Sequence, residues 1–163
     1  MKFSKLTERI SQLGSDKWLV HLEARKLKKN NPNIIELTIG EPDQLPPNEL
    51  IQKCYESMIS GRTKYSNGRG EESLLEALAK KYQSRTSLKV SKNNFLCLPG
   101  TQTALFATVM CLVEEGDEIL VGDPYYATYE GIIKSSGANL IPIPLREEHD
   151  FCLLYTSPSP RDS

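Results

Sequence analysis

The residues best suited to chemistry lie where a short apolar run meets a helix-favouring segment. The run FLCL stops at Pro99 and Gly100, and the segment that follows begins with Thr101 and Gln102. A glycine can turn the backbone tightly and let it approach a ligand. The first amides of a helix have no partner inside the helix, and with the helix dipole they favour a phosphate dianion. This stretch predicts a phosphate site, but by itself it also fits an ordinary turn with Thr101 as a helix cap.

Aromatic residues and glycines elsewhere could complete such a site. The sequence DPYYATY places Tyr125, Tyr126 and Tyr129 just past an apolar run, and ligands of α/β proteins bind at the carboxyl ends of strands. Tyr65 lies in the glycine-rich loop GRTKYSNGRG, and Gly40 lies in the turn IGEPD. Packing or surface roles remain open for the tyrosines, and so does a plain positive-φ turn for Gly40.

The elements that position these residues follow from apolar periodicity and from turn signals. Short apolar strands that alternate with helices predict parallel β-α-β units, and hence an α/β fold. Gly137 is the expected C-cap of the last helix. We expect a helix over 18–29 capped by Ser15-Asp16, further helices over 48–59, 71–84, 101–115 and 126–137, and strands over 34–39, 93–99, 117–124 and 138–145.

Composition excludes several classes of function. A net charge of -1 gives no general attraction for nucleic acid, and no run of about 18 apolar residues predicts a membrane span. The four cysteines form no C-x-x-C pair and there are only two histidines, so we expect no zinc site. A reduced, cytoplasmic protein is the default for this cysteine usage. Neither G-x-G-x-x-G nor G-x-x-x-x-G-K-[ST] occurs, which weakens the prediction of a nucleotide-binding module.

Taken together, the motifs resemble the N-terminal part of a pyridoxal-phosphate-dependent aminotransferase of fold type I. The resemblance is to the class I/II group that contains aspartate aminotransferase, and it covers about residues 1 to 151. The matching pieces keep the family's order: IIELTIGEPD at 34–43, TKYSNGRG at 63–70, LPGTQTAL at 98–105, GDEILVGDPYYATY at 116–129 and GANLIPIPL at 137–145.

The resemblance implies how the chain is organised. Residues 1–45 would form an N-terminal helix, a strand and the GEPD loop, and residues 46–89 a helical segment with the Tyr65 loop. Residues 90–151 would begin the large domain, with the first part of its parallel sheet. The Ser/Pro-rich tail 152–163 departs from the family pattern and is expected to be disordered. A sequence foreign to the family accounts for it best, and a natural terminus is the alternative.

The resemblance also implies roles for residues. Gly100, Thr101 and Gln102 would form half of the cradle for the cofactor's phosphate. Tyr126 would stack on the pyridine ring, where many relatives carry tryptophan. Tyr65 would reach the phosphate in the partner subunit's site, which implies a homodimer.

The resemblance also implies one substrate contact, and the sequence departs from the family pattern at two places. Gly40 would offer its backbone amide to the substrate's α-carboxylate. Gln44 stands where relatives often carry an aromatic residue, and Leu74-Leu75 replaces a common leucine-arginine pair. Some features look most like relatives that use basic amino acids with pyruvate, while aspartate-type relatives remain possible.

The chemical centre of the family is expected downstream of this chain. Transamination needs a lysine bound to the cofactor, an aspartate on the pyridine nitrogen and an arginine on the substrate carboxylate. No lysine here falls in the required context, so we expect this chain to be inactive while its parent protein is an aminotransferase acting on an amino acid and a 2-oxo acid. A phosphate- or nucleotide-binding module and the sensor domain of a regulator are the alternatives.

Overall fold

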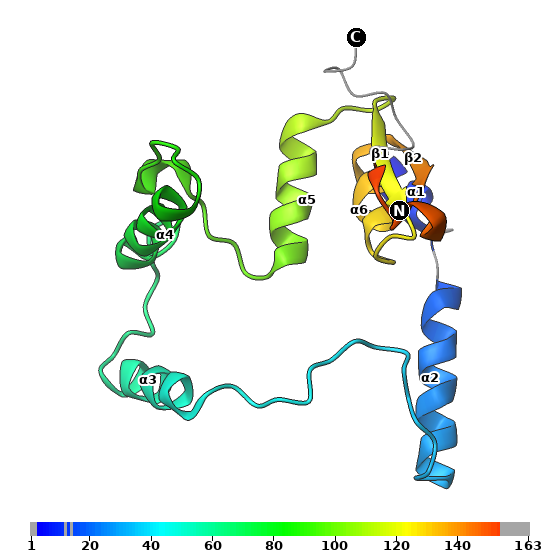
Figure 1. Cartoon of the computed structure of the whole chain (residues 1–163), viewed down its shortest axis with the longest axis horizontal. Helices are drawn as coiled ribbons and strands as arrows, with labels where there is room; N and C mark the ends of the chain where they lie inside the picture. Colours follow the sequence, from blue (N-terminus) through cyan, green and yellow to red (C-terminus); the bar gives the residue numbers. More distant parts are fainter. Residues whose placement is uncertain (1–2, 12, 14, 154–163) are drawn as a thin grey trace. The chain divides into compact units, whose positions relative to one another are not determined.

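The computed structural model describes residues 3–11, 13 and 15–153, and the chain divides into two units (Figure 1). Unit 1 comprises Met1–Glu36 and Thr101–Ser163, and unit 2 comprises Leu37–Gly100. Most of the tail predicted to be foreign, residues 154–163, lies outside the described residues. The predicted division into segments at residues 45, 89 and 151 stays a prediction.

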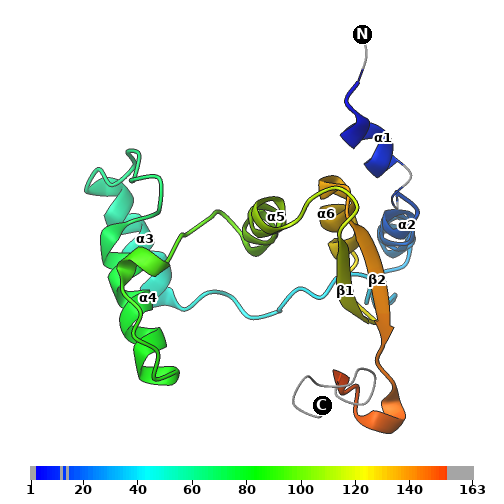
Figure 2. The same cartoon turned by 90° about the horizontal axis from the view of Figure 1, so that it is seen from above.

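Unit 1 contains a β-α-β motif. Strands β1 (Glu118–Asp123) and β2 (Asn139–Pro144) pair in parallel, with Glu118 opposite Asn139 and Asp123 opposite Pro144. Helix α6 (Tyr129–Ser136) connects them and packs on β2, and both views show the two strands side by side (Figure 1 and Figure 2). The parallel unit predicted over residues 117–145 is therefore confirmed.

Three further helices and a short 3-10 turn belong to unit 1. Helix α1 (Lys5–Ser11) packs against α6, and so does α5 (Thr101–Leu112). Helix α2 (Ser15–Asn30) confirms the predicted N-terminal helix, whereas α1 was not predicted. The 3-10 turn η2 (Glu147–His149) follows β2.

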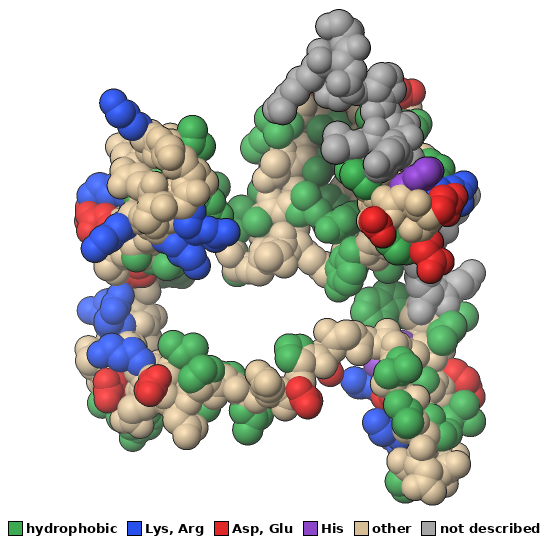
Figure 3. Space-filling view, in the orientation of Figure 1, with side chains coloured by type: hydrophobic (Ala, Val, Ile, Leu, Met, Phe, Trp, Pro, Cys, Tyr) green, Lys and Arg blue, Asp and Glu red, His purple; other side chains and the backbone are tan. Residues whose placement is uncertain are grey.

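The core of unit 1 is small. Its buried apolar residues are Val109 on α5, Ile132 and Ile133 on α6, and Ala138 directly before β2. Many large apolar side chains of α2 and α5 remain exposed, and hydrophobic side chains lie on the surface of these helices (Figure 3). Two strands and their connecting helix offer too little surface to cover them.

Unit 2 is organised around α4 (Glu72–Arg85), which buries Leu75 and Ala79. The 3-10 turn η1 (Lys92–Asn94) packs on α4, and the ring of Phe95 lies 5.4 Å from that of Tyr82. Helix α3 (Asn48–Ile59) begins and ends where the sequence predicted.

The predicted strand at 34–39 is wrong, because these residues have no secondary structure in the described chain. A strand needs a neighbouring ladder, and the described sheet contains only β1 and β2. The segment is held instead through a side chain, since the Glu36 carboxylate lies 3.0 Å from His21 Nδ1 and 3.7 Å from Arg25 Nε on α2.

The predicted strand at 93–99 is also wrong. It begins inside η1 and continues as extended chain outside the described sheet. The amide of Cys97 donates to the carbonyl of Arg69 at 2.9 Å, so its partner is a loop rather than a strand.

Two helices are shorter than predicted for local reasons. Helix α5 ends at Leu112 rather than 115, where the amide of Glu114 donates to the Asp117 carboxylate at 2.8 Å and starts a turn. Helix α6 begins at Tyr129 rather than 126, because its amide bonds to the Tyr126 carbonyl in a preceding turn. Gly137 has φ 92° and is the predicted C-cap.

Candidate functional site

The junction at Gly100 is a glycine turn that leads directly into a helix. Gly100 has φ 85°, and α5 begins at the next residue, Thr101. Thr101 is thus inside the first turn, and the residue before it has no side chain with which to cap the helix amides. A Cβ on Gly100 would meet no atom within 4 Å, so the turn needs glycine for its φ alone. The predicted helix start is confirmed, and phosphate binding by Thr101 and Gln102 stays a prediction.

Tyr126 lies just past the carboxyl end of β1, in the turn before α6. Its side chain is 60% exposed, and its ring makes an edge contact with Tyr129 at 5.9 Å. An edge contact leaves ring faces open for another flat group. Tyr125 is half-buried, as expected of a packing residue. The Thr128 hydroxyl in the same turn is buried and has no hydrogen-bond partner among the described residues.

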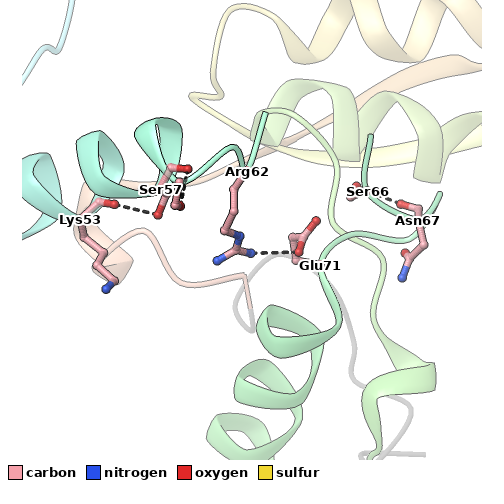
Figure 4. Close-up of polar contacts among 7 residues, drawn as sticks. Lys53, Ser57, Arg62, Ser66, Asn67 and Glu71 are labelled. Carbon is pink, nitrogen blue, oxygen red and sulfur yellow. Dashed lines mark hydrogen bonds and ion pairs between the residues drawn. The ribbon is translucent and has the colours of Figure 1, made fainter. Parts of the chain in front are cut away.

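Tyr65 lies on a groove in unit 2, with its side chain fully exposed. The groove measures about 590 Å³ and runs between α3 and the glycine-rich loop. Arg62 and Glu71 form an ion pair at 3.0 Å that joins the two ends of the loop (Figure 4). The groove is lined by Leu50, Lys53, Cys54, Ser57, Arg62, Lys64, Tyr65 and Glu71.

Gly40 does not have a positive φ, so that part of the turn interpretation is wrong, and its contact with a substrate stays a prediction. A Cβ at this position would meet no atom within 4 Å. The chain itself therefore places no steric or backbone demand for glycine at residue 40.

The predicted site residues are divided between the units. Thr101, Gln102 and Tyr126 belong to unit 1, whereas Gly40, Tyr65 and Gly100 belong to unit 2. Within unit 2, the groove is lined by Tyr65 but not by the two glycines.

Two lysines could be mistaken for catalytic amines. Lys92 hydrogen bonds to Glu72 and Glu76, with Glu76 at 3.1 Å, and these bonds raise the pKa of its ammonium, the one to Glu72 most. A lysine that attacks a carbonyl needs a lowered pKa. Lys134 pairs with Glu130 at 3.0 Å on α6. Both amines serve in ion pairs with carboxylates.

A second groove, of about 490 Å³, lies in unit 1 beside the amino-terminal halves of the strands. Its lining includes Arg9, Glu118 and Asn139. Ligands of α/β sheets bind at the opposite, carboxyl end, so this groove is not the candidate site. Among the described residues, no group of three or more His, Cys, Asp or Glu side chains could hold a metal ion, and no helix is long and apolar enough to cross a bilayer.

Sequence reasoning missed Arg69. Its side chain donates to the carbonyls of Asn93 and Phe95, the latter at 3.2 Å. An arginine between two loop glycines has no periodicity, so no signal in the sequence distinguishes it from a solvated side chain.

Comparisons with known proteins agree with the resemblance. The family model described as aminotransferase class I and II matches residues 32–156. An arginine–pyruvate transaminase of Pseudomonas aeruginosa is 34% identical over 151 residues, which cover 93% of this chain and 38% of the relative. The human kynurenine–oxoglutarate transaminase 3 is 31% identical over 150 residues, covering 91% of this chain and 32% of that protein.

Solved structures give the same result for the fold. An aspartate aminotransferase of Thermus thermophilus, solved with maleate, superposes with a TM-score of 0.83 at 25% identity, covering 99% of this chain and 41% of that one. This chain thus spans about two fifths of the length of the Pseudomonas aeruginosa and Thermus thermophilus relatives.

Proposed function

This chain belongs to the class I and II aminotransferase family and has the α/β fold of its type I members, and we propose that its parent protein is a transaminase that uses pyridoxal 5'-phosphate. The reaction moves an α-amino group between an amino acid and a 2-oxo acid. The observation that carries the proposal is the Gly100 turn at the start of α5, in a segment that lies within the family match.

The residues present fit the phosphate end of this cofactor. In the proposal, the amides of Thr101 and Gln102 bind the phosphate, because a helix N-terminus stabilises a dianion. Gly100 lets the backbone turn into the helix. Tyr126 covers one face of the pyridine ring with its exposed ring. Bound pyridoxal phosphate supplies the electron sink that amino-group transfer requires.

Tyr65 is proposed to serve the partner subunit's site in a homodimer. Full exposure of its side chain supports this role, because no other part of unit 2 covers the ring. The ion pair between Arg62 and Glu71 joins the two ends of the loop, and this closure limits the conformations of the loop that carries Tyr65.

Gly40 is proposed to donate its amide to the substrate's α-carboxylate. Open space around the position and an ordinary φ support this assignment, because the chain's own packing does not call for glycine there. The arginine–pyruvate transaminase among the relatives supports a basic amino acid with pyruvate as substrates. Aspartate-type substrates are the second choice.

The amine that performs the chemistry is proposed to lie in the part of the parent protein that follows this chain. Lys92 and Lys134 are engaged by carboxylates, and neither lies in the family's lysine context. The chain would bind the phosphate weakly and catalyse no transfer. A cytoplasmic location completes the proposal.

A binding experiment on two forms of the cofactor tests this function. We expect the purified chain to bind pyridoxal 5'-phosphate more tightly than pyridoxal, which lacks the phosphate. Gly100→Ala should remove the difference, while the control Gly116→Ala should keep it, because Gly116 also has a positive φ and open space but lies elsewhere. Equal binding of the two compounds by the unmodified chain would refute the phosphate site.

The full-length protein decides between the candidate activities. Arginine or aspartate is supplied as amino donor, with pyruvate or 2-oxoglutarate as acceptor, and the new amino acid is measured. A full-length protein that binds the cofactor but transfers no amino group would instead favour the sensor domain of a regulator.

A further inference from the structure

Hydrogen bonds join two stretches of unit 2 that are far apart in sequence, and we call this contact the fastening. The glycine-rich loop meets the segment 93–97 through Arg69, whose carbonyl accepts from the amide of Cys97 at 2.9 Å. The Arg69 guanidinium donates from Nη2 to the carbonyls of Asn93 and Phe95. One residue therefore makes three hydrogen bonds to one segment, two through its side chain and one through its backbone.

The adjoining glycine allows this approach. Gly70 has φ 114°, and a Cβ built on it would lie 2.9 Å from the Cβ of Cys97. Only glycine fits so close to another backbone in that conformation. Arg69 and Gly70 therefore bring the loop and the segment into direct contact.

The loop is also held from within. The amide of Arg69 donates to Asn67 Oδ1 at 2.9 Å, and the amide of Gly70 donates to the Asn67 carbonyl at 3.1 Å. The ion pair of Arg62 and Glu71 closes the loop ends (Figure 4). Arg69 thus lies on a turn that hydrogen bonds and an ion pair stabilise, and its own hydrogen bonds hold residues 93–97 against that turn.

We propose that Arg69 is a positioning residue that couples the loop carrying Tyr65 to the segment leading into Gly100, so that the loop and this segment move as one body. This inference rests on the proposed function. Tyr65 lies four residues before Arg69, and Gly100 lies three residues after Cys97. An extended chain spans at most about 3.6 Å per residue, so Tyr65 and Gly100 each lie within roughly 15 Å of the hydrogen bonds between Arg69 and the segment 93–97.

The coupling has a consequence for the proposed homodimer. Gly100 serves the subunit's own site, whereas Tyr65 serves the partner's. Arg69 would therefore link the two sites of the dimer through a single subunit. Cofactor binding at one site orders the Gly100 segment and, through Arg69, the tyrosine that the other site uses.

The test compares three variants of the full-length protein: Arg69→Met removes the donors, Arg69→Lys keeps a cation, and Arg85→Met is a matched control on α4. Hydrogen exchange of peptides containing Gly70 and Cys97 gives the first readout. The dissociation constant of pyridoxal 5'-phosphate gives the second. Arg69→Met should speed exchange at both peptides but not along α4, and should weaken cofactor binding about tenfold for two lost hydrogen bonds. Arg69→Lys should restore part of the affinity, and Arg85→Met should match the unmodified protein.

The two readouts separate the possible failures. Unchanged exchange at Gly70 and Cys97 would overturn the fastening, whatever the cofactor does. Faster exchange along the whole of α4 would make Arg69 a stability residue and would also overturn the inference. If Arg69→Met speeds exchange only in the peptides containing Gly70 and Cys97 but leaves the cofactor affinity unchanged within twofold, the coupling to the phosphate site is overturned. An unmodified protein that binds no cofactor would refute the proposed function, while exchange would still decide the fastening.

Discussion

Replacing Gly70 by alanine should destabilise unit 2 more than any other alanine substitution in its glycine-rich loop. Alanine at φ 114° is in a region that side chains rarely adopt, and its Cβ would lie 2.9 Å from that of Cys97. Ordinary carbon contacts are at about 3.5–4.0 Å, so one backbone must move. Backbone strain of about 1–3 kcal/mol and overpacking of about 1–3 kcal/mol give a total loss of about 2–4 kcal/mol, because movement relieves part of each.

The loop contains its own control. Gly68 has no positive φ, and a Cβ there would meet nothing within 4 Å. Gly68→Ala should therefore change stability by less than about 0.5 kcal/mol, or raise it slightly by restricting the unfolded chain. Both variants have the same composition and lie two residues apart, so their difference isolates the geometry at Gly70.

Hydrogen exchange along α4 is the suitable assay, because it reports the opening of unit 2 separately from that of unit 1. A second substitution, Cys97→Gly, removes the atom that the new Cβ would meet. The double-mutant cycle should give a coupling of about 1 kcal/mol or more between the two positions. If Gly70→Ala and Gly68→Ala agree within about 0.5 kcal/mol, or if the cycle gives no coupling, the close contact between loop and segment is wrong.

Three further outcomes follow from the described residues. Lys92→Met should reduce stability near neutral pH relative to the control Lys80→Met. The hydrogen bond from Lys92, and then its charge, hold the pKa of Glu72 below its ordinary value. The ion pair therefore stabilises the fold above the pKa of the unfolded chain and is lost as pH falls through the lowered pKa, so the difference between the variants in urea titrations should vanish in acid. Leu75→Ala should cost about 2–5 kcal/mol because the side chain is buried, whereas Leu74→Ala, at a half-exposed position, should cost much less in the same titration. Borohydride reduction of the chain with pyridoxal 5'-phosphate should leave no single lysine stoichiometrically modified in peptide mass spectra, and one such lysine would contradict a downstream catalytic amine.

Local signals were sufficient for the elements that local interactions stabilise. Helix α3 was predicted with its observed bounds, and Gly137 ends α6 with the expected left-handed cap. The parallel pair of β1 and β2 was predictable because its connecting helix is short and its strands are adjacent in sequence.

The errors have a non-local cause. The segments 34–39 and 93–99 have strand-like sequences, but a strand exists only where a partner supplies a ladder. The first is instead held by its Glu36 carboxylate, which pairs with His21 and Arg25 on α2, and the second by Arg69. Both contacts join residues that are distant in the sequence, so local sequence patterns do not predict them. The contact of Arg69 also involves backbone carbonyls, which any residue could have supplied.

Three glycines illustrate how the site differs from its scaffold. Gly70 is required because the chain touches itself there, and Gly100 is required because its φ of 85° turns the chain into α5. Gly40 meets neither condition, since its φ is ordinary and its surroundings are open. For the first two the physical reason is contained in the described structure. The described residues supply no such reason for glycine at residue 40, and the proposed approach of a substrate carboxylate to its backbone amide would supply one.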